Sequence, residues 1–173
     1  MRAQTGGAFP QFYPRDDSTY ENCEANRQEG EDYLRAVLEE SGQGRVVGED
    51  LGTVPPYVRP SLRSLGVATF KIPQWENNED GRSIPGCEYQ RLSVATYATH
   101  DHKPLQALWQ ETLANSTTQQ ALSDIMKIAE FAGVSPPQLG ANFERDFYAP
   151  VLEALFRSES WLTIVMITDL LAR

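Results

Sequence analysis

The hydrophobic and polar positions of this 173-residue chain follow two patterns. Apolar residues three or four positions apart indicate amphipathic helices, and short continuous apolar runs indicate buried strands. The helical spacing predicts helices at residues 27–41, 55–66, 105–114, 117–132 and 144–157. The apolar runs predict strands at residues 45–48, 67–72, 93–98 and 161–167.

Two stretches follow neither pattern. Residues 1–26 are rich in Gly, Pro and polar side chains, and we expect an irregular or disordered lead-in there. Residues 73–92 form a long polar loop, of a length that is usually functional or disordered. The remaining chain, residues 27–173, is long enough for one domain with a sizeable core.

The order of the predicted elements indicates the fold class. Strands that alternate with helices predict an α/β fold with a parallel sheet whose faces are covered. Active sites of such folds lie beyond the carboxyl ends of the strands. Four predicted strands fit either a small open sheet or half of a (β/α)8 barrel, which typically needs about 250 residues.

Two carboxylates follow the first predicted strand. Glu49 and Asp50 come directly after Val46-Val47-Gly48. Acids in this position can cap the next helix or face water. Alternatively, a carboxyl group among apolar walls keeps its proton to higher pH and can act as a general acid. Because neighbouring residues of an extended segment point in opposite directions, only one of the two is expected to face a site.

The third predicted strand ends in a second polar group. Asp101 lies there between His100 and His102, the only histidines of the chain. These residues could form an ordinary polar turn. Alternatively, Asp101 could stabilise positive charge on a sugar ring, with His100 donating a hydrogen bond to the same substrate. A metal site is a poor fit, since the two histidines would diverge on an extended chain and no third ligand is evident.

Polar residues also follow the other two predicted strands, Gln74 and Trp75 after the second and Asp169 after the fourth. We expect the groups at all four strand ends to face a common mouth. Trp75 and Tyr89 of the long loop could pack as ordinary loop residues. Alternatively, their rings could serve as a platform for the apolar face of a sugar.

Composition and charge narrow the range of partners. The net charge of −9 argues against nucleic acid, whose phosphates would be repelled, and fits a neutral substrate. The chain shows no signal-peptide core, and its longest apolar run, residues 161–167, is too short to span a membrane. Cys23 and Cys87 could form one disulfide, but two reduced cysteines in a cytoplasmic protein fit better.

Sequence motifs of nucleophilic and phosphate-binding sites are missing. The chain contains no GxSxG, GxxxxGK[ST] or GxGxxG, and neither cysteine lies near a histidine in sequence. Carboxylate chemistry remains, and glycoside cleavage is its main case.

Two segments carry a family resemblance. The stretch GRVVGEDLGTVPPYVRPSLRSLGVATFKIPQWE, followed by LSVATYATHDHKPLQALWQE, resembles the 4-α-glucanotransferases, the amylomaltase or disproportionating-enzyme family of the α-amylase clan. The resemblance extends from about residue 24 to the C-terminus and is strongest over residues 44–110. An EDLG segment followed about fifty residues later by a THD segment is a specific combination.

The resemblance implies a retaining transfer of α-1,4-glucan segments between malto-oligosaccharides, without cofactor or metal, on a (β/α)8 barrel. It implies three carboxylates: an aspartate nucleophile, a glutamate acid/base and an aspartate that stabilises the transition state. Glu49 matches the glutamate of EDLG, and Asp101 matches the aspartate of THD. We expect four further residues to bind the substrate or to support the residues that do: Asp50, Gln74, Trp75 and His100.

The chain departs from the family in three ways. The nucleophile motif Arg-x-Asp-His is missing from residues 1–48, where Asp16 and Asp17 lack a preceding apolar strand. The Asn- and Trp-containing tail after the last strand is also missing, and many members have Asn where this chain has His102. We therefore expect residues 27–173 to be the C-terminal portion of a single catalytic barrel, truncated at both ends and inactive without its N-terminal half.

Two other functions remain open at this stage. An α-glucan hydrolase would use the same carboxylates, with water in place of the acceptor sugar. A non-catalytic glucan-binding remnant would keep the binding residues and lack turnover.

Overall fold

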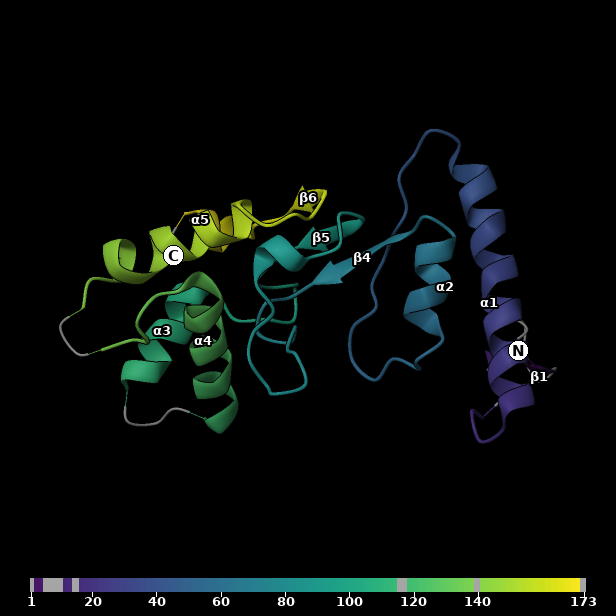
Figure 1. Ribbon diagram of the computed structural model, residues 1–173, viewed down its shortest axis with the longest axis horizontal. Helices are drawn as coiled ribbons and strands as arrows, with labels where there is room; N and C mark the ends of the chain where they lie inside the picture. Colours follow the sequence, from purple (N-terminus) through teal and green to yellow (C-terminus); the bar gives the residue numbers. More distant parts are fainter. Residues whose placement is uncertain (1, 5–10, 14–15, 115–117, 139–140, 172–173) are drawn as a thin grey trace. The chain divides into compact units, whose positions relative to one another are not determined.

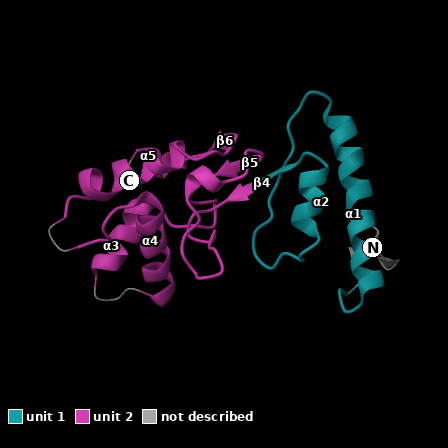
Figure 2. Cartoon of the chain, in the orientation of Figure 1, with its two compact units in different colours: residues 1–69 teal, residues 70–173 magenta. Residues whose placement is uncertain are grey.

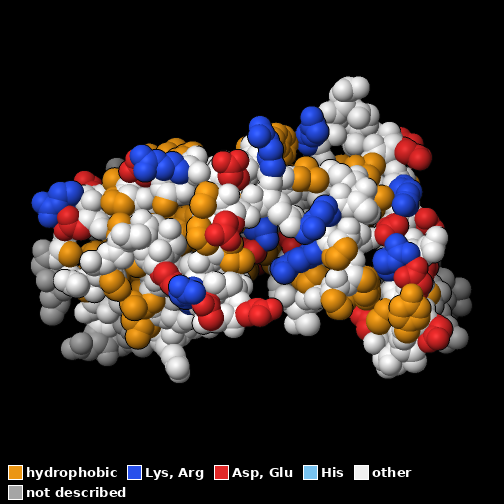
Figure 3. All heavy atoms as spheres, viewed as in Figure 1, with side chains coloured by type: hydrophobic (Ala, Val, Ile, Leu, Met, Phe, Trp, Pro, Cys, Tyr) orange, Lys and Arg blue, Asp and Glu red, His pale blue; other side chains and the backbone are white. Residues whose placement is uncertain are grey.

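The computed structural model describes residues 2–4, 11–13, 16–114, 118–138 and 141–171 of the chain (Figure 1). It divides into two compact units, residues 1–69 and residues 70–173 (Figure 2). Acidic and basic side chains are interspersed on the visible surface (Figure 3). Among the described helices, none combines the length and the apolar character that crossing a bilayer requires.

Four of the described strands form a sheet with the order β3-β4-β5-β6. Its strands are β3 (Val47–Gly48), β4 (Ala68–Lys71), β5 (Ser93–Ala95) and β6 (Leu162–Thr163). β3 pairs with β4 in parallel, and β5 pairs with β6 in parallel. Strands that lie side by side in chain order are the arrangement found in one part of a (β/α)8 barrel. The α/β fold predicted from the sequence is confirmed.

The first unit, residues 1–69, begins with an antiparallel pair, β1 (Arg2–Gln4) and β2 (Gln11–Tyr13), and continues with helix α1 (Tyr20–Ser41). The irregular lead-in expected over residues 1–26 is therefore wrong where these elements lie. The Oγ1 of Thr19 accepts a hydrogen bond from the backbone N–H of Asn22 at 3.1 Å, so a capping residue begins the helix. Hydrophobic spacing missed this turn because residues 20–26 are mostly polar.

Helix α2 (Val58–Ser64) completes the first unit. Pro60 lies in its first turn, where a missing N–H costs little. Glu31 of α1 is buried and accepts hydrogen bonds from Ser61 of α2 and from Arg27 and Arg35 of its own helix. The bond from Ser61 joins α1 to α2.

In the second unit, residues 70–173, helices share a hydrophobic core with Ala95 of β5. The helices of this unit are α3 (Leu105–Leu113), α4 (Gln119–Ala132), the π-helical turn η2 (Glu144–Tyr148), α5 (Ala149–Phe156) and the short α6 (Ile167–Leu170). The apolar faces of α3, α4 and α5 meet in one core. Its largest fully buried side chains are Ile125, Ile128, Phe147, Val151 and Leu155.

The last predicted strand is shorter and more exposed than the sequence indicates. A buried strand over residues 161–167 was expected, but β6 has two residues and α6 begins at Ile167. Trp161 and Ile164 are exposed. In the described sheet β6 pairs only with β5, so its other edge has no neighbouring strand.

Candidate active site

The first candidate carboxylates follow β3 and lie in different environments. Glu49 is exposed, whereas the side chain of Asp50 is 1% exposed. Adjacent residues of an extended segment are expected to diverge in this way. Arg59 Nε donates to Asp50 Oδ2 at 2.8 Å, and Arg59 Nη2 donates to the Asp50 carbonyl oxygen at 3.3 Å. Asp50 therefore anchors this segment to α2.

The second candidate carboxylate, Asp101, follows β5 on a turn that lies open to solvent. Its side chain is 78% exposed, and that of His100 is 79% exposed. His100 Nε2 lies 3.3 Å from Asp101 Oδ1, so the two side chains are neighbours. Both groups can be reached by a substrate that approaches this end of the sheet.

The third residue of this turn, His102, is held by two contacts. Its Nδ1 accepts a hydrogen bond from the backbone N–H of Thr99 at 3.1 Å and lies 3.0 Å from Thr99 Oγ1. Its ring also packs against Trp75, with 4.8 Å between centroids and 45° between planes. Trp75 remains 45% exposed, so it can present a ring face to a ligand.

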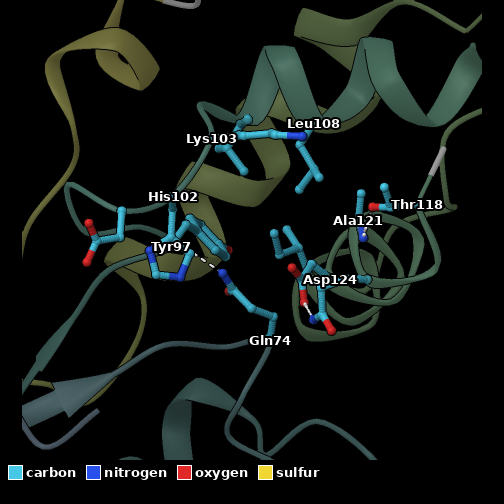
Figure 4. Close-up of a pocket in the computed structure, with 12 residues that line it drawn as sticks. Gln74, Tyr97, His102, Lys103, Leu108, Thr118, Ala121 and Asp124 are labelled. Carbon is cyan, nitrogen blue, oxygen red and sulfur yellow. Dashed lines mark hydrogen bonds between the residues drawn. The ribbon is translucent and has the colours of Figure 1, made fainter. Parts of the chain in front are cut away.

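Gln74 lies next to Trp75 but is buried. Its Nε2 donates to the carbonyl oxygen of Tyr97 at 2.7 Å, a bond that joins the segment after β4 to the segment after β5 (Figure 4). This bond fixes the orientation of the amide, because the reverse orientation would set two acceptors against each other.

The long polar loop that carries Gln74 and Trp75 is ordered. Lys71 Nζ lies 2.6 Å from Glu76 Oε2, and both side chains are mostly buried. Further along the loop, Ser83 Oγ donates to the carbonyl oxygen of Lys127 at 3.2 Å. Lys127 on α4 in turn donates to the carbonyl oxygen of Gly81. The loop is thus tied to β4 at its start and to α4 at its tip.

Tyr89 does not serve as a sugar platform. It is 5% exposed, belongs to the hydrophobic core and stacks on Phe131 at 5.7 Å between ring centroids. Burial raises the pKa of its hydroxyl well above the usual range. The sequence could not distinguish a loop aromatic that faces inward from one that faces solvent.

The sequence predicted that Asp169 faces the common mouth at the strand ends, but the structure places its side chain elsewhere. It is buried, and its Oδ1 accepts the backbone N–H of Leu105 at 2.7 Å. This N–H is one of the unpaired donors at the start of α3, so Asp169 caps that helix. Desolvation by burial raises the pKa of this carboxyl group.

A cavity of about 180 Å³ lies beside Asp101. The polar residues that line it include Gln74, Asp101, His102, Thr118, Gln120 and Asp124. Figure 4 shows Gln74, Tyr97 and His102 on one side, and Thr118, Ala121 and Asp124 of the α4 region on another. The sequence analysis did not select Thr118, Gln120 or Asp124. The only signal was the position of Gln120 and Asp124 four residues apart, on one helix face.

The structure thus brings together four of the six predicted site residues. Gln74 and Asp101 line one cavity, Trp75 packs on the histidine next to Asp101, and His100 pairs with Asp101. Glu49 and Asp50 belong to the first unit, where they follow β3. Among the described residues no group of His, Cys, Asp and Glu side chains is arranged to hold a metal, and Cys23 and Cys87 are free thiols.

Comparison with known proteins gives a consistent result. A family model described as 4-alpha-glucanotransferase matches residues 8–173. A 4-alpha-glucanotransferase of Chlamydia muridarum (strain MoPn / Nigg) is 32% identical over 164 residues, which cover 93% of this chain and 27% of that protein. A 4-alpha-glucanotransferase of Chlamydia caviae is 34% identical over 143 residues, which cover 82% of this chain and 22% of that protein.

Comparison with solved structures supports the fold. The amylomaltase from Streptococcus agalactiae, in complex with acarbose, matches with a TM-score of 0.56 and 22% identity, covering 83% of this chain and 26% of that chain. The chain spans about a quarter of the length of the curated relatives it matches.

Proposed function

The chain belongs to the 4-alpha-glucanotransferase family, and we propose that it supplies part of the catalytic site of an enzyme that transfers α-1,4-glucan segments between malto-oligosaccharides. The observation that carries this proposal is the position of two acids. Glu49 follows β3 and Asp101 follows β5, each at the carboxyl end of its strand. Active-site residues of barrel enzymes lie at these ends.

In the proposed reaction, Glu49 moves the protons. An aspartate nucleophile attacks the anomeric carbon, the glycosidic C–O bond breaks, and the proton of the Glu49 carboxyl group goes to the leaving oxygen. Glu49, now ionised, takes the proton of an acceptor hydroxyl, whose oxygen displaces the aspartate from the anomeric carbon. The exposure of Glu49 at the end of β3 supports this role, because the group must be reached by substrate and acceptor.

The other site residues have separate roles in the proposal. Asp101 stabilises the positive charge that develops on the sugar ring. Trp75 offers a ring face to the glucan. His100 and Gln74 contact sugar hydroxyls. Asp50 is a positioning residue, which holds the Glu49 segment through its contacts with Arg59.

The nucleophile is proposed to come from outside these 173 residues. Retaining enzymes place two carboxyl groups about 5 Å apart across the bond that breaks. No Arg-x-Asp-His segment occurs in residues 1–48, and the chain covers about a quarter of its relatives. We therefore propose that residues 27–173 are one portion of a (β/α)8 catalytic domain and that the N-terminal half of the barrel is its partner.

The proposal also covers cofactor use and cellular location. The reaction uses no cofactor or metal, since carboxylates supply both proton transfer and charge stabilisation. We place the enzyme in the cytoplasm, in keeping with its free cysteines.

The test is the product pattern on maltotriose. The full-length protein should yield glucose together with oligomers longer than maltotriose, because a sugar accepts the transferred segment. Glucose and maltose alone would identify a hydrolase. Retention of maltodextrin binding without turnover would identify a glucan-binding remnant.

A further inference from the structure

The turn that carries Asp101 is closed by two residues that bind each other in both directions. The backbone N–H of His102 donates to the carbonyl oxygen of Thr99 at 3.1 Å, which makes residues 99–102 a β-turn. The backbone N–H of Thr99 donates in return to His102 Nδ1 at 3.1 Å. His100 and Asp101 are the two central residues of this turn. The side chain of His102 therefore helps to fix the backbone that carries both groups.

The contact with Thr99 determines which nitrogen of the His102 ring carries the proton. A backbone N–H can only donate, so Nδ1 must accept and is unprotonated. Thr99 Oγ1 lies 3.0 Å from the same nitrogen and can donate its hydroxyl proton to it. In the neutral imidazole the proton then lies on Nε2. A proton on Nδ1 would face the N–H of Thr99 and break the closure of the turn.

The same ring of His102 supports Trp75. The two ring centroids lie 4.8 Å apart, with 45° between the planes. The residue before Trp75, Gln74, is bonded to the carbonyl oxygen of Tyr97, so the backbone at this point is held. Rotation of the indole is the freedom that remains, since its ring is 45% exposed. Contact with the His102 ring restricts that rotation.

We propose that His102 is a positioning residue of the glucan site, whose Nε2–H tautomer joins the turn of His100 and Asp101 to the ring of Trp75. This inference rests on the proposed function for the roles of Asp101 and Trp75. Two parts of one side chain then act on different steps. Nδ1 holds the turn of Asp101, which acts in the transition state, and the ring holds Trp75, which acts in binding.

The first experiment measures the tautomer without turnover. Long-range ¹H–¹⁵N NMR of the 173-residue chain at about pH 8 distinguishes protonated from unprotonated nitrogens of a neutral imidazole. The chain has two histidines, so His100→Gln assigns the remaining signals to His102. His102 should show a single form with the proton on Nε2. A proton on Nδ1, or a mixture of the two tautomers, would overturn the proposal.

The ring contact is measured on the indole of Trp75. Its N–H signal, assigned with Trp75→Phe, should shift when His102→Asn removes the neighbouring ring. The indole signal of Trp161, elsewhere in the same unit, is the control and should stay in place. A Trp75 signal that does not move in His102→Asn would show that the ring of His102 does not hold the indole.

Two variants of the full-length protein separate the two contacts kinetically. His102→Asn removes the ring and keeps an acceptor, because the amide Oδ1 takes the place of Nδ1. It should raise KM for maltotriose several-fold with kcat nearly unchanged. His102→Phe keeps a ring and removes the acceptor, so it should lower kcat several-fold with a smaller change in KM.

A residue with a merely structural role would not split the two constants in this way. Circular-dichroism melting checks that both variants fold, and the tautomer measurement on the unmodified chain decides the proposal if one of them does not. Wild-type kinetics in both variants, or the same change of kcat and KM in both, would overturn the proposal.

Failure of this inference can be distinguished from failure of the proposed function. A full-length protein that transfers glucan, in a chain whose His102 carries its proton on Nδ1, contradicts the role of His102 alone. The Nε2–H tautomer and the contact with Trp75, in a protein that transfers no glucan, contradict the proposed function alone.

Discussion

Arg59 holds the buried carboxylate of Asp50, with 2.8 Å between the guanidinium Nε and Asp50 Oδ2. The guanidinium also binds the Asp50 carbonyl oxygen, so one side chain fixes both the side chain and the backbone of this residue. Glu49 is the preceding residue and is exposed. The ion pair thus positions the backbone that carries the proposed acid/base.

Arg59→Ala should lower the free energy of unfolding by about 2 kcal/mol, because a buried carboxylate loses its cation while Arg59 itself is half exposed. Urea denaturation measures this change. Arg63→Ala, an exposed arginine of the same helix, is the control and should change stability by less than about 0.5 kcal/mol. Equal losses in the two variants would show that the pair contributes nothing specific.

The carboxylate of Glu31 predicts a pH dependence of stability. Hydrogen bonds from Ser61 and then from Arg27, with the charges of Arg27 and Arg35, lower its pKa below the usual 4.5 in the folded protein. A lowered folded pKa stabilises the protein above the unfolded pKa, and this contribution is lost as pH falls through the folded pKa. Glu31→Gln should therefore be less stable than the wild type at pH 7, with the gap closing below about pH 4.

Thermal melts between pH 7 and pH 3 measure the gap. Glu40→Gln, on the same helix and exposed, is the control and should follow the wild type at each pH. A gap between Glu31→Gln and the wild type that stays constant over this range would exclude the carboxylate as its source.

Two buried tyrosines differ in whether their hydroxyl groups are hydrogen-bonded, so they can be compared directly. The hydroxyl of Tyr97 donates to the carbonyl oxygen of Val151 at 2.7 Å, whereas the hydroxyl of Tyr89 has no partner among the described residues. Tyr97→Phe should cost about 1 kcal/mol of unfolding free energy, and Tyr89→Phe should be neutral or stabilising. Calorimetric melting measures both. A larger loss for Tyr89→Phe than for Tyr97→Phe would contradict this account of the core.

The sequence predicted the parts of the structure that depend on hydrophobic pattern. The four strands, in their order along the chain, and the helices around α3, α4 and α5 follow from apolar spacing and alternation. The start of α1 was not predicted, because a side-chain cap at Thr19 begins a polar first turn that leaves no hydrophobic signal.

The sequence also did not predict the direction in which particular side chains point. Trp75 and Tyr89 lie in one loop and have similar local sequence character, yet one is exposed and the other is buried against Phe131. Asp169 follows a strand as Asp101 does, but it points to the start of α3 instead of a solvent-facing site. Tertiary contacts made by distant residues decide these cases, and no local pattern encodes them.

Replacing Trp75 should change the affinity for glucan. Trp75→Ala removes the exposed ring that packs on His102 and should raise KM for maltodextrin about tenfold, with a smaller effect on kcat. Steady-state kinetics of the full-length enzyme measure both constants. Trp161→Ala, which removes a ring of similar exposure elsewhere in the same unit, is the control and should leave KM unchanged. A rise in KM of the same size in both variants would remove Trp75 from the proposed site.

The central claim is that Glu49 donates the proton to the leaving oxygen. Comparing maltotriose with a glycosyl fluoride as donor for Glu49→Gln tests this claim most directly. Fluoride leaves a sugar without being protonated, whereas the oxygen of maltotriose requires a proton. In the full-length enzyme, Glu49→Gln should lower turnover of maltotriose by about 10²-fold or more, because an amide cannot donate the proton. The initial release of fluoride from α-maltotriosyl fluoride should fall by less than about tenfold. Equal losses with both donors, or wild-type turnover of maltotriose, would contradict the assignment of Glu49 as the acid/base.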